Sequence, residues 1–204
     1  MKDQASIAAA KSRTGPALWA VAGLCAALML LTALIEAGMG RHFFSTSGKL
    51  LLWVNSTTSS ETSQQFFDWY SVTHVLHGMI MYAVIRGLGS WRKGGLALGT
   101  VLLMTVAIES AWEILENSSL VINRYREATI ALGYTGDTIL NSMMDIGCCA
   151  LGCVMAWRIP AWLTVSLAVG SEIVLAILIR DNLTLNVLML LWPVDAVKHW
   201  QMGG

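Results

Sequence analysis

Long apolar runs separated by short polar stretches dominate the pattern along this chain. Five of these runs reach the roughly 20 residues that an α-helix needs to cross a hydrocarbon core about 30 Å thick. They cover residues 17–38, 70–88, 95–116, 138–157 and 161–179. A sixth run, Leu183 to Trp192, is too short to span and precedes Pro193, which is typical of an interfacial or re-entrant helix. The pattern predicts an all-α integral membrane bundle of about five transmembrane helices plus this short C-terminal helix.

The apolar runs also predict the domain organisation. We expect residues 1–16 to form a cytoplasmic N-terminal tail and residues 17–204 to form a single multi-pass membrane domain. The first run follows Lys11 and Arg13, as in a secretory signal, but it is longer than the apolar region of a signal peptide. Its end, residues 34–38, is also a poor cleavage site for a signal peptidase, so we expect the first helix to be retained as an anchor.

Basic residues near the helix ends predict the orientation, because Lys and Arg in short connections resist translocation. Arg86, Arg92 and Lys93 crowd the second connection, and Arg158 lies in the tight fourth one. With the basic tail they define the cytoplasmic side, which places the N-terminus in the cytoplasm. On this topology every Asp and Glu except Asp3, together with all four histidines, falls in the outer half of the membrane or outside it.

Composition narrows the function classes. Hydrophobic residues make up 55% of the chain and charged residues 13%, about half the usual charged share of roughly 25%. The 13 Lys and Arg balance the 13 Asp and Glu, which argues against a nucleic-acid binder or a disordered acidic segment. The partner implied by this composition is the lipid bilayer. The zero net charge is then the sum of a basic inner side and an acidic outer side.

Several ionisable side chains fall inside the predicted spans at one depth. Counting 1.5 Å per residue places them about 10–12 Å below the outer helix ends. Burying an unpaired charge there costs several kcal/mol, so such groups face a bundle interior or a wet cavity. Gly78 beside the histidines allows close helix approach. We expect a polar pocket open to the outer face, formed by His74 and His77, by Glu109, Glu113 and Glu116 on one helix face, and by Asp137, Asn141 and Asp145 on the next helix, with Glu172 as the least specific member.

Crowded carboxylates cannot all ionise, because like charges raise one another's pKa. Three arrangements relieve this: a carboxyl keeps a proton and acts as a general acid, it pairs with a histidine or arginine, or a divalent metal lies among the groups. Histidine with carboxylate oxygens suits zinc or manganese, whereas oxygens alone suit magnesium or calcium. No ligand motif such as H-E-x-x-H is present, and no serine-hydrolase elbow or nucleotide loop. The candidate metal ligands are His77, Glu109, Glu113, Asp137 and Asp145.

The stretches around these residues also carry a resemblance. They are Asp68-Trp69-Tyr70 with His74 and His77-Gly78, Glu109 to Asn117, Arg124-Tyr125-Arg126, Gly136-Asp137 to Asp145, and Ile179 to Leu190. With them the chain resembles the uncharacterised protein family 0314 (domain of unknown function 2585), bacterial multi-pass inner-membrane proteins. This resemblance implies a membrane class and a bacterial inner-membrane location, and no activity. A looser likeness to VanZ-like membrane proteins, through Asp68/His74, Glu109/Glu113 and Asp137/Asn141, hints at the cell envelope.

Two hypotheses of different classes stay open, an enzyme or binder and a structural protein. In the first, an outer-face pocket binds or modifies an envelope lipid or lipid-linked headgroup. The candidate catalytic residues are then His74, His77, Glu109, Glu113 and Asp145, and the candidate substrate contacts are Asp68, Asp137, Asn141, Arg124, Arg126 and Arg180. In the second, the protein is a non-enzymatic scaffold or assembly partner whose polar network is structural. A proton or ion carrier is less favoured, because the cytoplasmic half of each span lacks ionisable groups.

Overall fold

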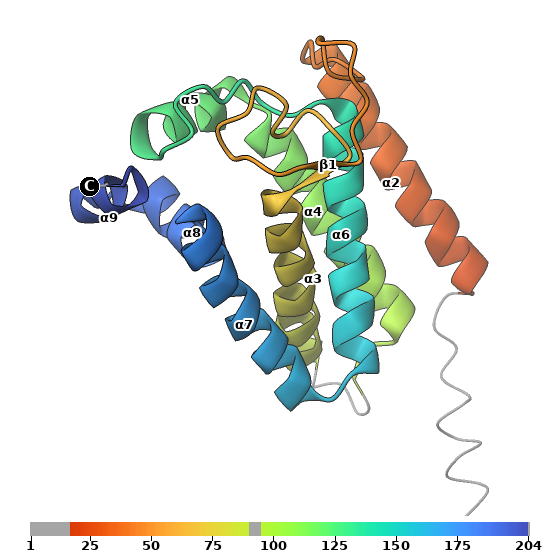
Figure 1. Ribbon diagram of the computed structural model, residues 1–204. Helices are drawn as coiled ribbons and strands as arrows, with labels where there is room; N and C mark the ends of the chain where they lie inside the picture. The colour runs from red at the N-terminus through yellow and green to blue at the C-terminus, as the bar shows by residue number, and fades with distance from the viewer. Residues whose placement is uncertain (1–16, 90–94, 204) are drawn as a thin grey trace, which may run out of the picture.

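The computed structural model describes residues 17–89 and 95–203, and over these residues the chain is almost entirely helical. The two strands found there, β1 (Trp53–Val54) and β2 (Phe67–Asp68), form one short parallel pair. The prediction of an all-α fold is confirmed. The helices are α2 (Leu18–Gly38), α3 (Trp69–Leu88), α4 (Leu98–Glu116), α5 (Ser119–Ala128), α6 (Ile139–Arg158), α7 (Ala161–Ile179), α8 (Leu183–Leu191) and α9 (Asp195–Gln201) (Figure 1).

Four helices of the described chain, α2, α4, α6 and α7, are long and apolar enough to cross a membrane. The fifth predicted span coincides with α3, a 20-residue helix that contains His74, His77 and Arg86 and is therefore less apolar. It lies at the centre of the bundle and packs most extensively against α6 (Figure 1). Because its neighbours cover its polar face, α3 need not be apolar all round. A crossing by α3 stays a prediction, and the predicted tail (residues 1–16) and Arg92 and Lys93 lie outside the described residues.

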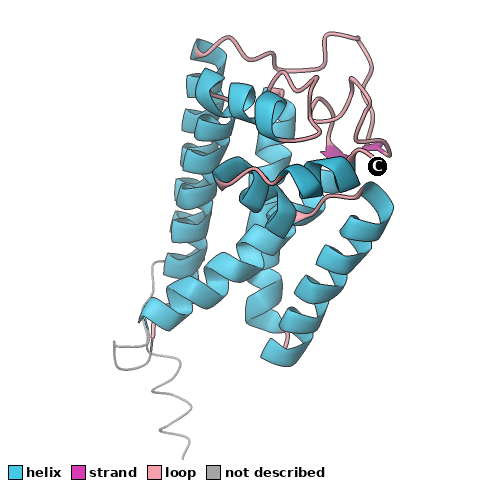
Figure 2. Cartoon of the chain, turned by 90° about the vertical axis from the view of Figure 1, so that its left-hand side faces the viewer, coloured by secondary structure: helices cyan, strands magenta, loops and turns pink. Residues whose placement is uncertain are grey.

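The long helices run alternately up and down, so one end of the bundle gathers the long connections. We call this end, formed by residues 39–68 and 117–138, the loop end. Figure 1 and the turned view in Figure 2 both place these connections together, opposite the short link between α6 and α7. The outer helices carry few buried residues: α7 buries only Leu175 among its described residues, and α2 buries only Val21, Thr32 and Glu36.

Side-chain caps at the loop end fix where α3 and α6 begin. The Asp68 carboxylate accepts a hydrogen bond from the Tyr70 N–H at 2.8 Å, and the Ser71 hydroxyl accepts one from the Asp68 N–H at 3.2 Å. This reciprocal pair is a capping box. At the start of α6, the Thr138 hydroxyl accepts a hydrogen bond from the Asn141 N–H at 3.3 Å. The polar side chains one or two turns further along both helices are thereby held at the same depth.

The backbones of α3 and α6 touch at two glycines. A Cβ on Gly78 would lie 1.8 Å from the carbonyl oxygen of Cys149, and a Cβ on Gly152 would lie 1.9 Å from that of Val75. Small residues at a helix contact permit this approach in membrane proteins. The expectation that Gly78 allows close helix packing beside the histidines is confirmed.

Two helices occur where the sequence analysis predicts only connections. The segment from Asn117 to Gly136 contains α5, and the chain after Pro193 forms α9. The short C-terminal helix predicted from residue 183 is present as α8. Both unpredicted helices are short, and each has too few apolar residues to stand out beside the long runs. α5 is part of the loop end, and α9 contacts it through the hydrogen bond from Lys198 Nζ to the Glu127 carbonyl oxygen.

Candidate acid–histidine site

His74 lies at the centre of a buried group of acids contributed by three helices. Its Nδ1 is 2.5 Å from Oε1 of Glu109 and 3.5 Å from Oε1 of Glu113, both on α4. Its Nε2 is 3.8 Å from Oδ2 of Asp145 on α6. All four residues are buried. We call this group, with His77 and Glu116, the acid–histidine cluster.

His77 lies one turn further along α3 and links the cluster to the exterior. Its Nδ1 is 3.2 Å from the same Glu109 oxygen that contacts His74. Its ring packs edge-on against His74 and against Trp112, with centroid distances of 5.2 and 6.4 Å. The His77 side chain is 19% exposed, whereas that of His74 is 8% exposed and that of Glu109 is fully buried. The cluster therefore reaches the molecular surface at His77.

The cluster contains carboxylates that the surrounding protein does not satisfy. Over residues 17–89 and 95–203, no Lys or Arg forms an ion pair with them, and the ion pairs present all involve His74 or His77. Oε2 of Glu109 and both oxygens of Glu113 have no hydrogen-bond partner among the described residues. Buried polar groups in proteins are normally hydrogen-bonded, because an unpaired one costs free energy. These oxygens are thus set apart from ordinary structural polar groups.

Glu36 shares this property and was missed by the sequence analysis. It lies in the last turn of α2, is completely buried, and neither of its oxygens has a hydrogen-bond partner in the described chain. A signal was present, because Glu36 is a carboxylate inside a predicted span, as Glu109 and Asp145 are. It was overlooked because no second ionisable residue repeats at helical spacing beside it, although the polar Thr32 lies four residues earlier.

Asp137 and Asn117 form a hydrogen-bonded network between the cluster and the loop end. The Asn117 amide nitrogen donates to Oδ2 of Asp137 and to the Ser142 hydroxyl, both at 3.2 Å, and Asn117 Oδ1 accepts the Asp137 N–H at 2.7 Å. The Tyr134 hydroxyl donates to Oδ1 of Asp137 at 3.0 Å. Burial raises the pKa of Asp137 to about 6, and the Tyr134 hydrogen bond opposes this rise. On the other side, the Ser71 hydroxyl donates to Oδ1 of Asp145 at 2.9 Å.

Asp68 and Asn141 are occupied by backbone groups of the loop end. The two Asp68 oxygens accept hydrogen bonds from the Tyr70 N–H and from the Ser63 N–H, the latter at 2.7 Å. Burial raises the pKa of the Asp68 carboxyl, whereas these bonds lower it. The Asn141 amide nitrogen donates to the Gln65 carbonyl at 3.1 Å. Both residues attach the segment 39–68 to the bundle directly above the cluster.

The three arginines predicted to contact a substrate lie outside the cluster and donate to carbonyl oxygens. These bonds run from Arg124 Nε to Leu190 at 2.8 Å, from Arg126 Nε to Tyr134 at 2.5 Å, and from Arg180 Nη1 to Trp200 at 3.1 Å.

Glu172 also lies apart from the cluster. Its two oxygens accept the N–H groups of Leu183 and Thr184, at 2.9 and 3.0 Å, where α8 begins. Its depth along α7 resembles that of the cluster acids along their own helices, but its side chain serves the corner between α7 and α8.

Two sets of side chains bring their ligand atoms within 4.8 Å of one another and could hold a metal ion: His74 with His77 and Glu109, and His74 with Glu113 and Glu116. Of the metal ligands proposed from the sequence, His77, Glu109 and Glu113 belong to these sets. Asp137 and Asp145 do not, and His74 and Glu116 are the additions. Glu116 could have been included from the sequence, because it shares the helix face of Glu109 and Glu113.

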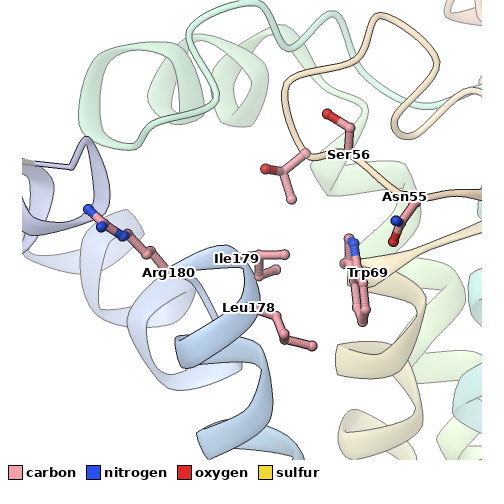
Figure 3. Close-up of a pocket in the computed structure, with 7 residues that line it drawn as sticks. Asn55, Ser56, Trp69, Leu178, Ile179 and Arg180 are labelled. Carbon is pink, nitrogen blue, oxygen red and sulfur yellow. The ribbon is translucent and has the colours of Figure 1, made fainter.

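Two surface hollows open at the loop end. The smaller, of about 230 Å³, is lined by Asp137 together with Arg41, His42, Thr46, Gln64, Thr135, Gly136 and Thr138. The larger, of about 450 Å³, lies between residues 55–57, Trp69 and the end of α7. Figure 3 shows Asn55, Ser56 and Trp69 facing Leu178 and Ile179 there, while the Arg180 side chain leads away toward the C-terminal helices. Only the smaller hollow includes a residue of the hydrogen-bonded network beside the cluster.

Comparison with known proteins assigns this chain to a family. The profile of the family described as "Protein of unknown function (DUF2585)" matches residues 36–203. A UPF0314 protein of Sphingopyxis alaskensis is 47% identical over 193 residues, covering 95% of this chain and 97% of the relative. UPF0314 proteins of Rhizobium meliloti and Paracoccus denitrificans are each 46% identical, over 92% and 85% of this chain and 92% and 88% of their own lengths. No solved structure matches the fold. By both measures the chain belongs to the UPF0314 (DUF2585) family, as the sequence resemblance implies.

Proposed function

We propose that this protein lies in the bacterial inner membrane with its N-terminus in the cytoplasm, and that its acid–histidine cluster binds or modifies the headgroup of an envelope lipid or lipid-linked molecule at the outer face. The observation that carries this proposal is the unsatisfied Glu113 carboxylate beside His74. A polar network with only a structural role gains stability when every member is hydrogen-bonded, and a half-satisfied one is worse than an apolar core. Glu113 therefore fits a reacting or ligand-binding group better than a structural one.

The contacts of His74 suit proton transfer. A histidine that lies between carboxylates can accept a proton from a substrate hydroxyl or water and pass it on, because imidazole titrates near neutral pH. Glu109 lies at hydrogen-bond distance from Nδ1 of His74, and Asp145 lies near Nε2. In this scheme His74 or His77 acts as the base, and Glu113 acts as the acid.

Two features of the surface suit a lipid-linked substrate. Of the two histidines in the cluster, His77 has the more exposed side chain. It lies on α3, beside Trp112. A group arriving laterally from the membrane would meet His77 first. At the loop end, Arg41 lines the same hollow as Asp137, and it supplies a positive charge where a lipid headgroup would lie. Arginine is well suited to phosphate and carboxylate recognition.

The scaffold hypothesis is favoured by a different observation, namely that Asp68, Asp137 and Asn141 are hydrogen-bonded to residues of the loop end. These residues hold the connections in place whatever the cluster does. If the whole network is structural, substitution of a cluster residue lowers the amount of folded protein. If the cluster is a site, the same substitution removes function and leaves folded protein in the membrane.

A complementation experiment separates the two functions. Cells that lack the gene are complemented with wild type, His77→Ala, Glu113→Gln, and the exposed-residue controls His199→Ala and Glu127→Gln. We expect the deletion to change the membrane lipid profile by mass spectrometry and the sensitivity to envelope-targeting antibiotics. The controls should restore both, whereas His77→Ala and Glu113→Gln should restore neither at wild-type protein levels. Restoration by both cluster variants, or a deletion without any change, would overturn the proposal.

A further inference from the structure

We propose that the acid–histidine cluster binds one divalent metal ion, Zn²⁺ or Mn²⁺, through His74, His77, Glu109 and Glu113. The inference concerns the same cluster as the proposed function and does not require that the substrate be a lipid. With an ion bound, His74, His77 and Glu113 would act as ligands in place of base and acid, and the ion would polarise the bound group. It brings together two imidazoles and two carboxylates from α3 and α4, adjacent helices in the bundle. Mixed nitrogen and oxygen donors suit Zn²⁺ and Mn²⁺, whereas Mg²⁺ and Ca²⁺ prefer oxygen alone.

Three of the four donors already lie close enough to share an ion: the ligand atoms of His74, His77 and Glu109 are within 4.8 Å of one another, whereas Glu113 meets His74 in a second set. Ligands bound at about 2.0–2.2 Å in a tetrahedral site lie about 3.3–3.5 Å from each other. Nδ1 of His77 is 3.2 Å from Oε1 of Glu109, and Nδ1 of His74 is 3.5 Å from Oε1 of Glu113. The contact of 2.5 Å between His74 and Glu109 is a hydrogen bond, which has to open by about 1 Å for both atoms to bind an ion. To complete a four-ligand site, Glu113 also has to approach the set of His74, His77 and Glu109.

The unpartnered oxygens are a second and independent observation. Glu109 and Glu113 are fully buried, and three of their four oxygens have no hydrogen-bond partner in the described chain. No Lys or Arg forms an ion pair with either residue over the described ranges, so the protein supplies little positive charge to them. A divalent cation at this point would satisfy the oxygens and offset the charge at once.

Asp145 has the position of a residue that orients a metal-binding histidine. When His74 binds through Nδ1, its Nε2–H faces Oδ2 of Asp145, 3.8 Å away. A metal-ligating histidine usually donates its other ring N–H to a carboxylate, a carbonyl or water. Asp145 is itself held by the Ser71 hydroxyl, which belongs to the capping box of α3. We therefore assign Asp145 a positioning role and not a ligand role.

Metal analysis of the purified full-length protein tests the site. Wild type and variants are purified in detergent, stripped with a chelator, and dialysed against Zn²⁺, Mn²⁺ or Mg²⁺ alone, and bound metal is measured by plasma mass spectrometry. We expect one Zn²⁺ or Mn²⁺ per wild-type chain and no comparable Mg²⁺ binding. Affinity should fall by about tenfold or more in His77→Ala and Glu113→Gln, and stay unchanged in His199→Ala and Glu127→Gln.

His77 is partly exposed at the edge of the cluster, so His77→Ala should still fold. A loss of metal binding in this variant can then be assigned to the missing ligand. Folding of each variant is checked by circular dichroism and gel filtration. Less than half an ion per wild-type chain, or folded cluster variants that keep wild-type affinity, would overturn the metal site. If the metal binds but complementation with His77→Ala and Glu113→Gln is normal, the lipid proposal alone fails. If complementation is lost but wild type holds no metal, the metal site alone fails.

Discussion

The buried acids of this protein differ in how their oxygens are used. Asp68, Asp137 and Asp181 accept hydrogen bonds from backbone or side-chain groups of the connecting segments, so their burial is compensated locally. Glu36 and Glu113 are equally buried and have no such partners in the described chain. The first kind explains how the connections are fixed to the bundle. The second kind marks the groups that we expect to bind a ligand or react.

Asp181 is a buried acid whose oxygens accept hydrogen bonds, and the pH dependence of protein stability tests its environment. Its Oδ1 accepts hydrogen bonds from the Asn182 N–H at 2.9 Å and from the Gln201 amide at 3.0 Å, and the Tyr70 hydroxyl donates to Oδ2 at 3.2 Å. Burial nevertheless raises the pKa of Asp181 from 3.8 to about 6. A raised pKa in the folded state means that the stabilising contribution is complete below about pH 4 and is lost as the pH rises through about 6.

The variant Asp181→Asn should remove this pH dependence, because an amide stays neutral. Relative to wild type, its melting temperature in detergent should rise between pH 4.5 and pH 7.5, by an amount equivalent to at most about 2–3 kcal/mol. Thermal unfolding followed by circular dichroism at several pH values measures the difference. A difference between the two proteins that is constant with pH, or that moves the other way, would contradict the assignment.

At the scale of elements, the contact between α3 and α6 holds the cluster together, because it sets the distance between His74 and Asp145. The contact depends on glycine, since the atoms that a Cβ would meet are backbone carbonyls that cannot move aside. Overpacking of a close contact destabilises a protein by about 1–3 kcal/mol. Gly152 on α6 faces Val75 of α3, whereas Gly147, on the same helix, has nothing within 4 Å of its Cβ position.

We expect Gly152→Ala to lower the melting temperature of the purified protein and Gly147→Ala to leave it unchanged or to raise it. Alanine is favoured over glycine inside a helix by about 1 kcal/mol. The control Gly147→Ala receives this gain alone, whereas in Gly152→Ala the clash with the Val75 carbonyl outweighs it. Fluorescence-detected gel filtration after heating measures both in crude detergent extracts. Equal stability of the two variants would show that α3 and α6 are not in backbone contact at Gly152.

The same scale shows what the sequence could predict. The long helices follow from uninterrupted apolar runs, and the acids of α4 and α6 follow from helical spacing, because both signals are local. The helix α5 could not be predicted in this way. Its stability depends on tertiary contacts such as the 2.9 Å hydrogen bond from the Tyr125 hydroxyl to Asn186 on α8. Glu36 is buried because α2 packs against α4 and α6, and no spacing within one helix records that contact.

For the whole molecule, the distribution of charge along the bundle axis matters more than the net charge of zero. Arg86 and Arg158 lie at the last turns of α3 and α6, at the end opposite the loop end. The cluster, the hydrogen-bonded network and both surface hollows lie in the other half. A membrane around α2, α4, α6 and α7 would also enclose α3, which lies among them in the bundle (Figure 1). The described helices thus leave room for a fifth crossing by α3, which stays a prediction.

Cysteine labelling tests this topology in cells. Ser47 is exposed at the loop end and Leu88 is exposed at the opposite end of α3, whereas the native cysteines all lie within α2 and α6. We expect Ser47→Cys to react with a membrane-impermeant maleimide in intact spheroplasts, and Leu88→Cys to react only after lysis, both measured against the unmodified protein. The reverse pattern would invert the orientation and place the cluster toward the cytoplasm. Labelling of both in intact spheroplasts would show that α3 does not cross, and the cluster would then need a different route to its ligand.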